Sequence, residues 1–148
     1  MRGFACIGLH MPKDHLNIGE VLRAAGCYEA AMVAISGKRY QRARTDTRAQ
    51  HRHMPVIHSV DDLKTVIPFG CVPVAVDLIP DATPLPDYSH PESAFYIFGP
   101  EDGTLGDQVL TWCKDRVYVP TRHCMNLAAT VNVVLYDRLS KRKEARHG

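Results

Sequence analysis

A β-branched run that stops at a proline constrains the fold of this chain more than any other feature. Val117-Tyr118-Val119 precedes Pro120, which has no N–H for a sheet and holds the residue before it in extended geometry. This pattern predicts a buried strand that ends at Pro120. A polar loop, residues 121–126, separates the strand from the next apolar segment.

The segment after this loop has the apolar spacing of a helix. Its apolar positions recur at helical intervals and form one stripe: Leu127, Val131, Val134 and Leu135. Asn126 stands immediately before them, where a helix-capping side chain belongs. A strand, a tight loop and a capped helix start place free backbone N–H groups where a ligand can reach them. An ordinary C-terminal βα unit is the alternative.

The rest of the chain alternates between apolar runs and helical patterns. Strands are predicted at residues 4–9, 30–36, 55–58, 72–78 and 94–98, and helices at residues 17–25, 59–66 and 105–113. Near-continuous apolar strands that alternate with helices indicate an α/β fold with a mostly parallel sheet flanked by helices. No repeat or change of composition divides residues 1–148, so a single domain is predicted.

Local signals predict where several of these elements begin and end. Asn17 followed by Glu20 resembles a capping box, and Gly26 is placed to stop that helix. Ser59 is placed to cap the next helix. The segment from Pro80 to Pro91 holds four of the ten prolines, and we predict a surface connection there because proline is excluded from central strands.

Composition and targeting signals bound the class of protein. The 148 residues are 45% hydrophobic and 23% charged, as in a globular protein. No stretch approaches the roughly 20 apolar residues of a membrane helix, and residues 4–9 are too short for the core of a signal peptide. We therefore predict a cytoplasmic protein without a membrane-spanning segment.

The five cysteines are odd in number, widely spaced and form no CxxC pair, so reduced thiols are predicted. Four lie among apolar neighbours and are predicted to be small core residues: Cys6, Cys27, Cys71 and Cys113. Cys124 lies in the polar loop beside His123, and a cysteine nucleophile there has no partner that the sequence names. No spacing of histidines and cysteines matches a zinc site, so no metal is predicted.

Charge is distributed unevenly along the chain. The net charge is +2, yet residues 38–53 contain six lysines and arginines against one acidic residue, and residues 141–148 contain four against one. Two basic segments on an otherwise acidic chain favour an anionic partner, most simply a nucleic-acid backbone. Arg42, Arg44 and Arg48 are the predicted contacts to such a backbone. A solvated arm and a solvated tail are the alternative.

Two further motifs carry polar residues next to predicted elements. In Asn17-x-Gly19-x-x-x-Arg23, Arg23 lies far from the apolar stripe of its helix and therefore reaches either a cleft or solvent. Phe98-Gly99-Pro100-Glu101 follows a predicted strand and continues into more glycines, at neither dinucleotide nor P-loop spacing. We interpret this turn as a backbone site with one functional carboxylate, Glu101.

Three motifs, taken in order, resemble those of the SpoU/TrmH branch of the SPOUT RNA methyltransferases. They are Asn17-x-Gly19-x-x-x-Arg23, Phe98-Gly99-Pro100-Glu101, and Val119-Pro120 with Cys124-Met125-Asn126-Leu127. The most similar members are short, extension-free proteins that methylate ribose 2′-hydroxyls in the tRNA anticodon loop. The family usually has serine at the position of Cys124 and glycine at the position of Thr104.

The resemblance implies a fold, a cofactor and an assembly. The fold is an α/β domain whose C-terminal segment is threaded into a deep trefoil knot, and the assembly is a homodimer with the active site at its interface. The knot holds S-adenosylmethionine, mainly through backbone groups. By position, the cofactor loops are Val76-Asp77-Leu78, Gly99-Pro100-Glu101, and Val119 through Leu127, which includes Pro120, Cys124, Met125 and Asn126. The polar site residues are Asn17, Arg23, Glu101 and Asn126.

These residue types suit methyl transfer to a ribose 2′-hydroxyl. Such an in-line displacement depends on holding the 2′-oxygen against the methyl carbon. Because a guanidinium is effectively always protonated, we predict that Arg23 holds the adjacent phosphate and stabilises developing alkoxide charge rather than acting as a base. The predicted substrate is tRNA, and rRNA is the second choice.

Two other functions fit parts of the sequence. Cys124, together with a glycine displaced by one position to Gly103, is compatible with a knotted RNA-binding protein that has lost catalysis. Cofactor binding would separate that protein from an enzyme. A small nucleotide- or flavin-binding module would show no salt-dependent affinity for RNA, and the two basic segments argue against it.

Overall fold

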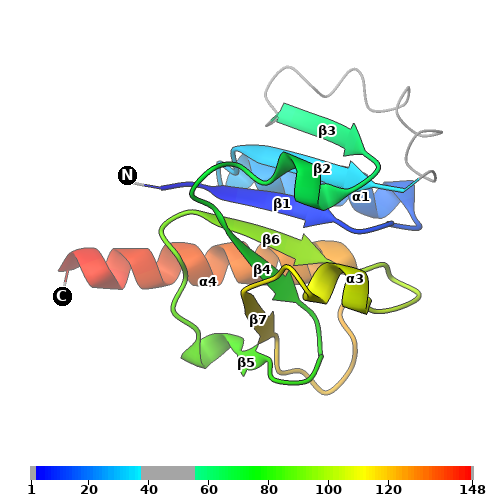
Figure 1. Cartoon of the computed structure of the whole chain (residues 1–148). Coiled ribbons are helices and arrows are strands. Elements are labelled where there is room, and N and C mark those ends of the chain that lie inside the picture. Colours follow the sequence, from blue (N-terminus) through cyan, green and yellow to red (C-terminus); the bar gives the residue numbers. More distant parts are fainter. Residues whose placement is uncertain (1–2, 38–55, 148) are drawn as a thin grey trace.

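The strands form one parallel sheet whose spatial order differs from their order in the chain. The computed structural model describes residues 3–37 and 56–147. Its strands are β1 (Ala5–Leu9), β2 (Met32–Ser36), β3 (Val56–Val60), β4 (Val72–Val76), β5 (Thr83–Pro84), β6 (Ala94–Phe98) and β7 (Asp115–Tyr118). They lie in the order β3-β2-β1-β6-β4-β7-β5, and every pair is parallel (Figure 1). The predicted α/β fold with a parallel sheet is confirmed.

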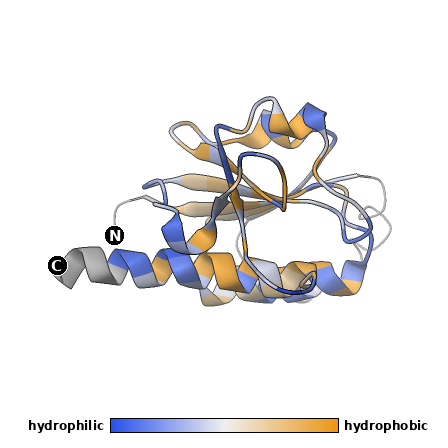
Figure 2. Ribbon diagram, turned by 90° about the horizontal axis from the view of Figure 1, so that it is seen from below, coloured by the Kyte–Doolittle hydropathy of each residue, from blue (hydrophilic) through white to orange (hydrophobic). Residues whose placement is uncertain are grey.

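Helices cover both faces of this sheet. The long helices α1 (His15–Cys27) and α4 (Leu127–His147) lie on one face, whereas the 3-10 helix η2 (Leu63–Val66) and the short helix α3 (Asp107–Leu110) lie on the other. A second 3-10 turn, η3 (Leu85–Asp87), follows β5. Figure 2 shows α4 running along one side of the apolar strands. Within the described ranges, no helix is both long and apolar enough to cross a membrane.

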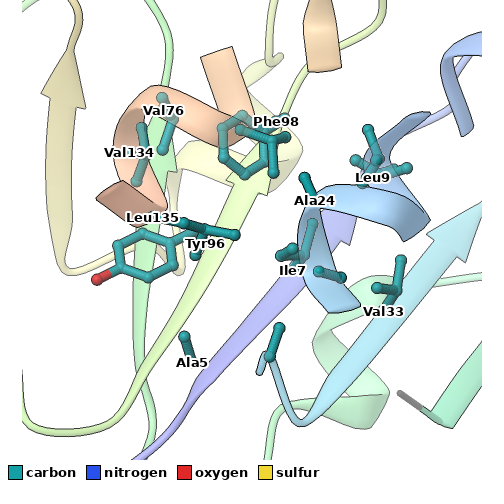
Figure 3. Packing of buried hydrophobic residues seen from close by; sticks show 14 of the residues in the cluster. Ala5, Ile7, Leu9, Ala24, Val33, Val76, Tyr96, Phe98, Val134 and Leu135 are labelled. Atoms are coloured by element: carbon teal, nitrogen blue, oxygen red, sulfur yellow. The ribbon is translucent and has the colours of Figure 1, made fainter. Parts of the chain in front are cut away.

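The two sides of the sheet carry separate halves of the core, because successive side chains of a strand point to opposite faces. On β6, Tyr96 and Phe98 belong to the cluster that α1 and α4 cover. Phe95 and Ile97 belong to the cluster under η2 and α3. Figure 3 shows Leu135 of α4 beside Tyr96 in the first cluster. All five residues of β1 and of β6 are buried, as expected for the central strands of a covered parallel sheet.

Helix α1 begins earlier than predicted. Its cap is Asp14, whose side chain accepts a hydrogen bond from the amide of the second helical residue at 2.9 Å. The predicted capping box at Asn17 and Glu20 is therefore wrong, because an acidic side chain nearer the strand satisfies the free amide first. Asn17 lies within the first turn of the helix, and its side chain makes a different contact.

Other element ends also differ from the prediction. Helix α1 continues through Gly26, and the left-handed residue after it is Glu29, at φ 56°. Strand β3 extends through Ser59, so the capping side chain of η2 is Asp62 instead. In each case a neighbouring residue takes the role that the sequence pattern assigned to another.

Element lengths differ most where the apolar pattern is weak. The predicted helix at residues 105–113 is a single turn, α3, whereas α4 extends well beyond its predicted apolar stripe. The proline-rich connection contains the edge strand β5, which the sequence did not indicate. The five thiols are free, and Cys27 is exposed, which corrects its prediction as a core residue.

A buried polar cluster joins α4 to the loop before β6. The ring of His90 bonds the Tyr96 hydroxyl through Nδ1 at 2.7 Å and the Asp137 carboxylate through Nε2 at 2.6 Å. Lys141 forms an ion pair with Asp137 at 2.8 Å. Arg138 is 5% exposed, and its guanidinium donates to two backbone carbonyls of the loop and to Tyr96. These bonds hold residues 137–141 of α4 against that loop.

Candidate cofactor site

A cavity of about 590 Å³ opens at the carboxyl edge of the sheet, where β4, β6 and β7 end. Three loops line it, at residues 76–78, 98–103 and 118–127, and Asn17 of α1 completes the wall. Carboxyl ends of parallel strands are the usual ligand sites of open α/β sheets. The volume lies within the roughly 300–1,000 Å³ of small-molecule sites. Motifs separated in the sequence thus meet at one cavity.

Glu101 joins the turn after β6 to the start of α1. Its Oε1 accepts a hydrogen bond from the Asn17 side-chain amide at 3.0 Å, and its Oε2 accepts one from the Lys13 backbone amide at 2.9 Å. The backbone amide of Asp14 donates to Oε1 at 3.5 Å. The carboxylate therefore holds two of the three motifs in contact.

The same contacts set the charge of Glu101. Partial burial raises the pKa of its carboxyl group, because burial disfavours the ionised form. Hydrogen bonds from the backbone amides of Lys13 and of Glu101 itself, and from Asn17 and Asp14, outweigh that effect, and the pKa lies below its usual value. Glu101 is therefore an anion at neutral pH.

Asp77 makes a second connection between loops. Its Oδ1 accepts from the backbone amide of Leu78 and its Oδ2 from that of Leu105, both at 2.8 Å. The loop after β4 is thereby fixed to the segment after β6. A side chain at Gly99 would lie 3.2 Å from the Leu105 nitrogen, so glycine permits this close approach.

Asn126 caps α4, as predicted. Its side-chain Oδ1 accepts a hydrogen bond from the backbone amide of Ala129 at 2.7 Å, and its carbonyl accepts from Thr130. Because the side-chain oxygen is engaged in the cap, the Asn126 amide group is the part of this side chain that can donate to a ligand.

The predicted cofactor residues all line the cavity. They are Val76, Asp77, Leu78, Gly99, Pro100, Glu101, Val119, Pro120, Cys124, Met125, Asn126 and Leu127. Thr121, Arg122 and His123, which lie within the predicted loop from Val119 to Leu127, line it as well. Sequence reasoning missed four other neighbours: Phe98, Gly103, Tyr118 and Thr130. It also missed the amides of Lys13 and Asp14, because backbone donors leave no mark in residue types.

Arg23 does not line this cavity. It follows Asn17 by six residues, which places it about 9 Å further along α1 and turned by roughly 240° about the helix axis. Its side chain is exposed. The predicted RNA contacts Arg42, Arg44 and Arg48 lie outside the described residues.

Thr104 and Cys124, the two positions that depart from the family pattern, do not block the cavity. Thr104 is exposed, and a side chain at Gly103 would contact only Pro100, at an ordinary 3.5 Å. Cys124 is also exposed, and lines the cavity wall. Among residues 3–37 and 56–147, no three histidine, cysteine or acidic side chains are grouped to hold a metal ion.

Fold and site together define an α/β protein with a loop-built cofactor cavity at the carboxyl edge of a parallel sheet. Residues 5–136 match the model of the SpoU rRNA methylase family, and the chain belongs to this family. The predicted SpoU/TrmH relationship is thus confirmed. The family comprises RNA methyltransferases that depend on S-adenosylmethionine, which is the predicted cofactor.

Solved structures share the fold at low sequence identity. The SpoU methyltransferase AviRb from Streptomyces viridochromogenes is 18% identical over 98% of this chain and 62% of its own, with a TM-score of 0.79. The A. aeolicus TrmH/SpoU tRNA modifying enzyme is 14% identical over 95% of this chain and 76% of its own, with a TM-score of 0.80.

A third structure matches over nearly its whole length. It is described as giving insights into the 2-OH methylation of C/U34 on tRNA, and is 20% identical over 96% of this chain and 98% of its own, with a TM-score of 0.74. By contrast, the chain spans less than two thirds of the AviRb protein, which has also been solved in complex with AdoMet. No curated protein sequence matches the chain.

Proposed function

We propose that this protein is an S-adenosylmethionine-dependent RNA ribose 2′-O-methyltransferase acting on tRNA, with rRNA as the second choice of substrate. The observation that carries the proposal is the meeting of Asn17 with the loops of the other two motifs at one cavity, joined by the bond between Asn17 and Glu101 across 84 positions of sequence. Family membership supports the reaction class, RNA methyl transfer. The ribose 2′-hydroxyl and tRNA are the finer parts of the proposal. We also propose a cytoplasmic location.

The lining suits the cofactor. Val76, Phe98 and Leu127 supply apolar walls, and the turns at residues 99–101 and 119–125 bring backbone polar groups to the same cavity. The bound cofactor would supply an electrophilic methyl group carried on a sulfonium. Because Glu101 and Asp77 are engaged by backbone amides, their role is to hold the loops in position rather than to take a proton.

Arg23 is the proposed stabiliser of the reacting ribose. The 2′-oxygen forms a bond to the methyl carbon as the bond from that carbon to sulfur breaks, and the ribose proton leaves to phosphate or water. A planar guanidinium can hold the neighbouring phosphate in bidentate fashion and stabilise the developing negative charge. The Asn126 amide group lies at the cavity as a second donor.

A homodimer would complete this site. Helices α1 and α4 pack against each other and expose three large apolar side chains: Leu16 (71%), Tyr136 (60%) and Val133 (37%). Large apolar side chains exposed on two packed helices favour a protein contact. Since Arg23 does not line the cavity of its own chain, a second copy packed there could bring Arg23 of the partner subunit to it. Sedimentation of Leu16→Glu and Tyr136→Glu variants tests this, with monomers expected.

The threaded trefoil knot and the single domain over residues 1–148 are also part of the proposal. Strand β7 lies between β4 and β5, and the segment after it returns to the cavity beside the loops that follow β4 and β6. That path of the C-terminal segment between earlier loops supports a knot.

The experiment is methyl transfer from radiolabelled S-adenosylmethionine to bulk tRNA and, separately, to rRNA. Digestion and mass spectrometry identify the methylated nucleoside, and calorimetry measures cofactor binding. Arg23→Ala should bind the cofactor normally but transfer no methyl group, and Arg23→Lys should be nearly as impaired because lysine cannot form a bidentate contact. Near-normal turnover by Arg23→Lys would refute the proposed role of Arg23.

The same experiment decides between an enzyme and an RNA-binding protein without catalysis. If neither S-adenosylmethionine nor S-adenosylhomocysteine binds, the enzyme proposal fails. Replacing Arg42, Arg44 and Arg48 with alanine should weaken RNA binding and flatten its dependence on salt. With fewer phosphate contacts, binding releases fewer counterions from the RNA. Cofactor affinity should stay unchanged in that variant.

A further inference from the structure

A second cavity lies next to the cofactor site on the same edge of the sheet. It measures about 480 Å³, and its walls come from the ends of β1, β2 and β3 together with η2 and α3. Figure 1 shows η2 and α3 on the same side of the sheet, across from α1 and α4. None of the three sequence motifs contributes a residue to its lining.

One hydrogen bond joins the linings of the two cavities. The backbone amide of His10, which lines the second cavity, donates at 2.9 Å to the carbonyl of Phe98, which lines the first. The next residue along, Met11, bonds through its amide to Ser36 at the end of β2. The two cavities are therefore neighbours at this edge of the sheet.

The second cavity contains an aromatic surface of the kind on which nucleobases stack. Trp112 is the single tryptophan of the chain. It is half-buried, packs against the core cluster under η2 and α3, and also lines the cavity. An aromatic side chain fixed on its core side and open on the other can stack a base, and such stacking is tolerant of base identity.

The charges around the cavity oppose a phosphate as its occupant. Asp61 and Asp62 line it with one basic side chain, Lys64. Burial lowers the pKa of His10, and the charge of Asp62 opposes this only in part, so the ring is neutral at neutral pH. With two carboxylates against one ammonium, the cavity is negative and favours hydrogen-bond donors over anions.

The two carboxylates of the second cavity, Asp61 and Asp62, differ in the hydrogen bonds that they accept within the protein. Asp62 caps η2 by accepting from the backbone amide of Lys64 at 3.0 Å, which fixes its position. Asp61 is exposed and precedes it directly. Carboxylates accept hydrogen bonds from the exocyclic amino groups of bases, as they do from cytosine N4. Gln108, also on the wall, can donate and accept and so can read a base edge.

We propose that this cavity binds a nucleobase with an exocyclic amino group, adenine, cytosine or guanine, from a nucleotide next to the one that is methylated. The inference rests on the proposed function, because it assumes that RNA is the polymer at the first cavity. Trp112 stacks the base, and Asp61 accepts a hydrogen bond from its amino group. Uracil, which has no amino group, binds more weakly.

The single tryptophan gives a direct test. In a nitrogen-15 spectrum of the full chain, the indole N–H of Trp112 gives one signal, and cytidine, adenosine, guanosine and uridine monophosphates are titrated against it. The first three should move the signal at lower concentrations than uridine monophosphate. Adenosine monophosphate bound in the cofactor cavity would leave the signal unmoved, since Trp112 does not line that cavity.

Variants test the same base site during methylation of RNA. Asp61→Asn should raise the KM for RNA about tenfold, the loss expected for one hydrogen bond to a charged group, with kcat and cofactor affinity unchanged. Asp87→Asn is the matched control, because Asp87 is exposed and lines neither cavity. Trp112→Leu, which keeps an apolar side chain on the core, should also raise the KM.

The two proposals fail separately. An active enzyme in which Asp61→Asn and Trp112→Leu both match Asp87→Asn, and whose indole signal responds to no nucleotide, overturns the base site alone. A protein that binds no S-adenosylmethionine and methylates no RNA overturns the proposed function, while the tryptophan titration still reports on the second cavity.

Discussion

The two cavities at the carboxyl edge of the sheet are built from different parts of the chain. The first is formed by loops whose backbone amides are held by two carboxylates, Asp77 and Glu101. The second is lined by single residues from the ends of β1, β2 and β3, from η2 and from α3 with the turn after it, which holds Trp112. A backbone site needs glycines, prolines and a few acceptors at fixed spacing, and it therefore leaves a motif. A side-chain site of scattered residues leaves none.

Among the residues that hold the loops of the first cavity, the largest effect is expected at Glu101, the carboxylate that joins two motifs. Glu101→Ala removes the acceptor for Asn17 and for two backbone amides, so the turn after β6 separates from α1. We expect roughly a hundredfold loss of methyl transfer, as for two hydrogen bonds to a charged group. Rates on tRNA measure this, with circular dichroism to check folding.

Glu20→Ala is the control for Glu101→Ala. Glu20 is an exposed glutamate on α1 and does not line the first cavity. If Glu101→Ala and Glu20→Ala had equal rates, the first cavity would not depend on its carboxylate connections.

A smaller loss is expected at the second loop connection. Asp77→Asn keeps one acceptor oxygen but turns an amide donor toward the backbone N–H of either Leu78 or Leu105. One lost charged hydrogen bond predicts about tenfold weaker binding of S-adenosylhomocysteine. Calorimetry measures the affinity, and Asp81→Asn is the control because Asp81 is exposed in the same connection. Unchanged affinity would show that the loops hold their positions without this bond.

The polar cluster around His90 should affect stability but neither cavity. Burial lowers the pKa of His90 below its ordinary 6.5, although the hydrogen bond to Asp137 opposes this. A histidine with a lowered folded-state pKa binds protons more readily when unfolded, so stability falls as pH drops below about 6.5. Burial lowers the pKa of His10 as well, which acts in the same direction.

Melting temperatures at pH 7 and pH 5.5 measure this effect. The wild-type decrease should exceed that of His90→Gln by roughly 2–4 °C, the shift that about 1 kcal/mol produces at this size. His58→Gln, at an exposed position, should follow the wild type. Equal decreases in wild type and His90→Gln would assign the pH dependence to other groups.

The smallest effect is expected at Cys124. It is exposed in the wall of the first cavity, where the family usually has serine. If backbone groups supply most of the binding, Cys124→Ser should change cofactor affinity by less than about fivefold, since a net hydrogen bond is worth about 1 kcal/mol or less here. A larger gain on calorimetric titration would show that this side chain binds the cofactor directly.

The fold could be predicted from the sequence because buried strands of a covered parallel sheet are nearly all apolar. Residues 94–98 illustrate this, since every side chain of β6 is buried. Strand order could not be predicted in the same way, because an apolar run does not name its neighbour. The two-residue strand β5 was hidden by its proline, which the sheet accepts at an edge.

The candidate cofactor site could likewise be predicted only in part. Asn17 of the first motif and the loops of the other two motifs do meet at one cavity, since glycine and proline spacing reflects the local backbone. Arg23 of the first motif does not line it. The cap of α1 was predicted three residues late, because Asn17 and Asp14 are both good caps and only tertiary structure assigns Asn17 to Glu101. No role could be predicted for Trp112, because a single tryptophan forms no sequence pattern.

The strand order also sets the sequence of events during synthesis. Strand β1 is made first and pairs with β2, so a nucleus of β1, α1 and β2 can form early. Its other neighbour, β6, emerges about 90 residues later, and the last wall of the cofactor cavity, residues 118–127, later still. Contacts of such long sequence separation slow folding and leave the edge of β1 open in the meantime. The nascent chain must therefore keep that edge from aggregating until β6 arrives, and the ability to bind the cofactor is acquired last.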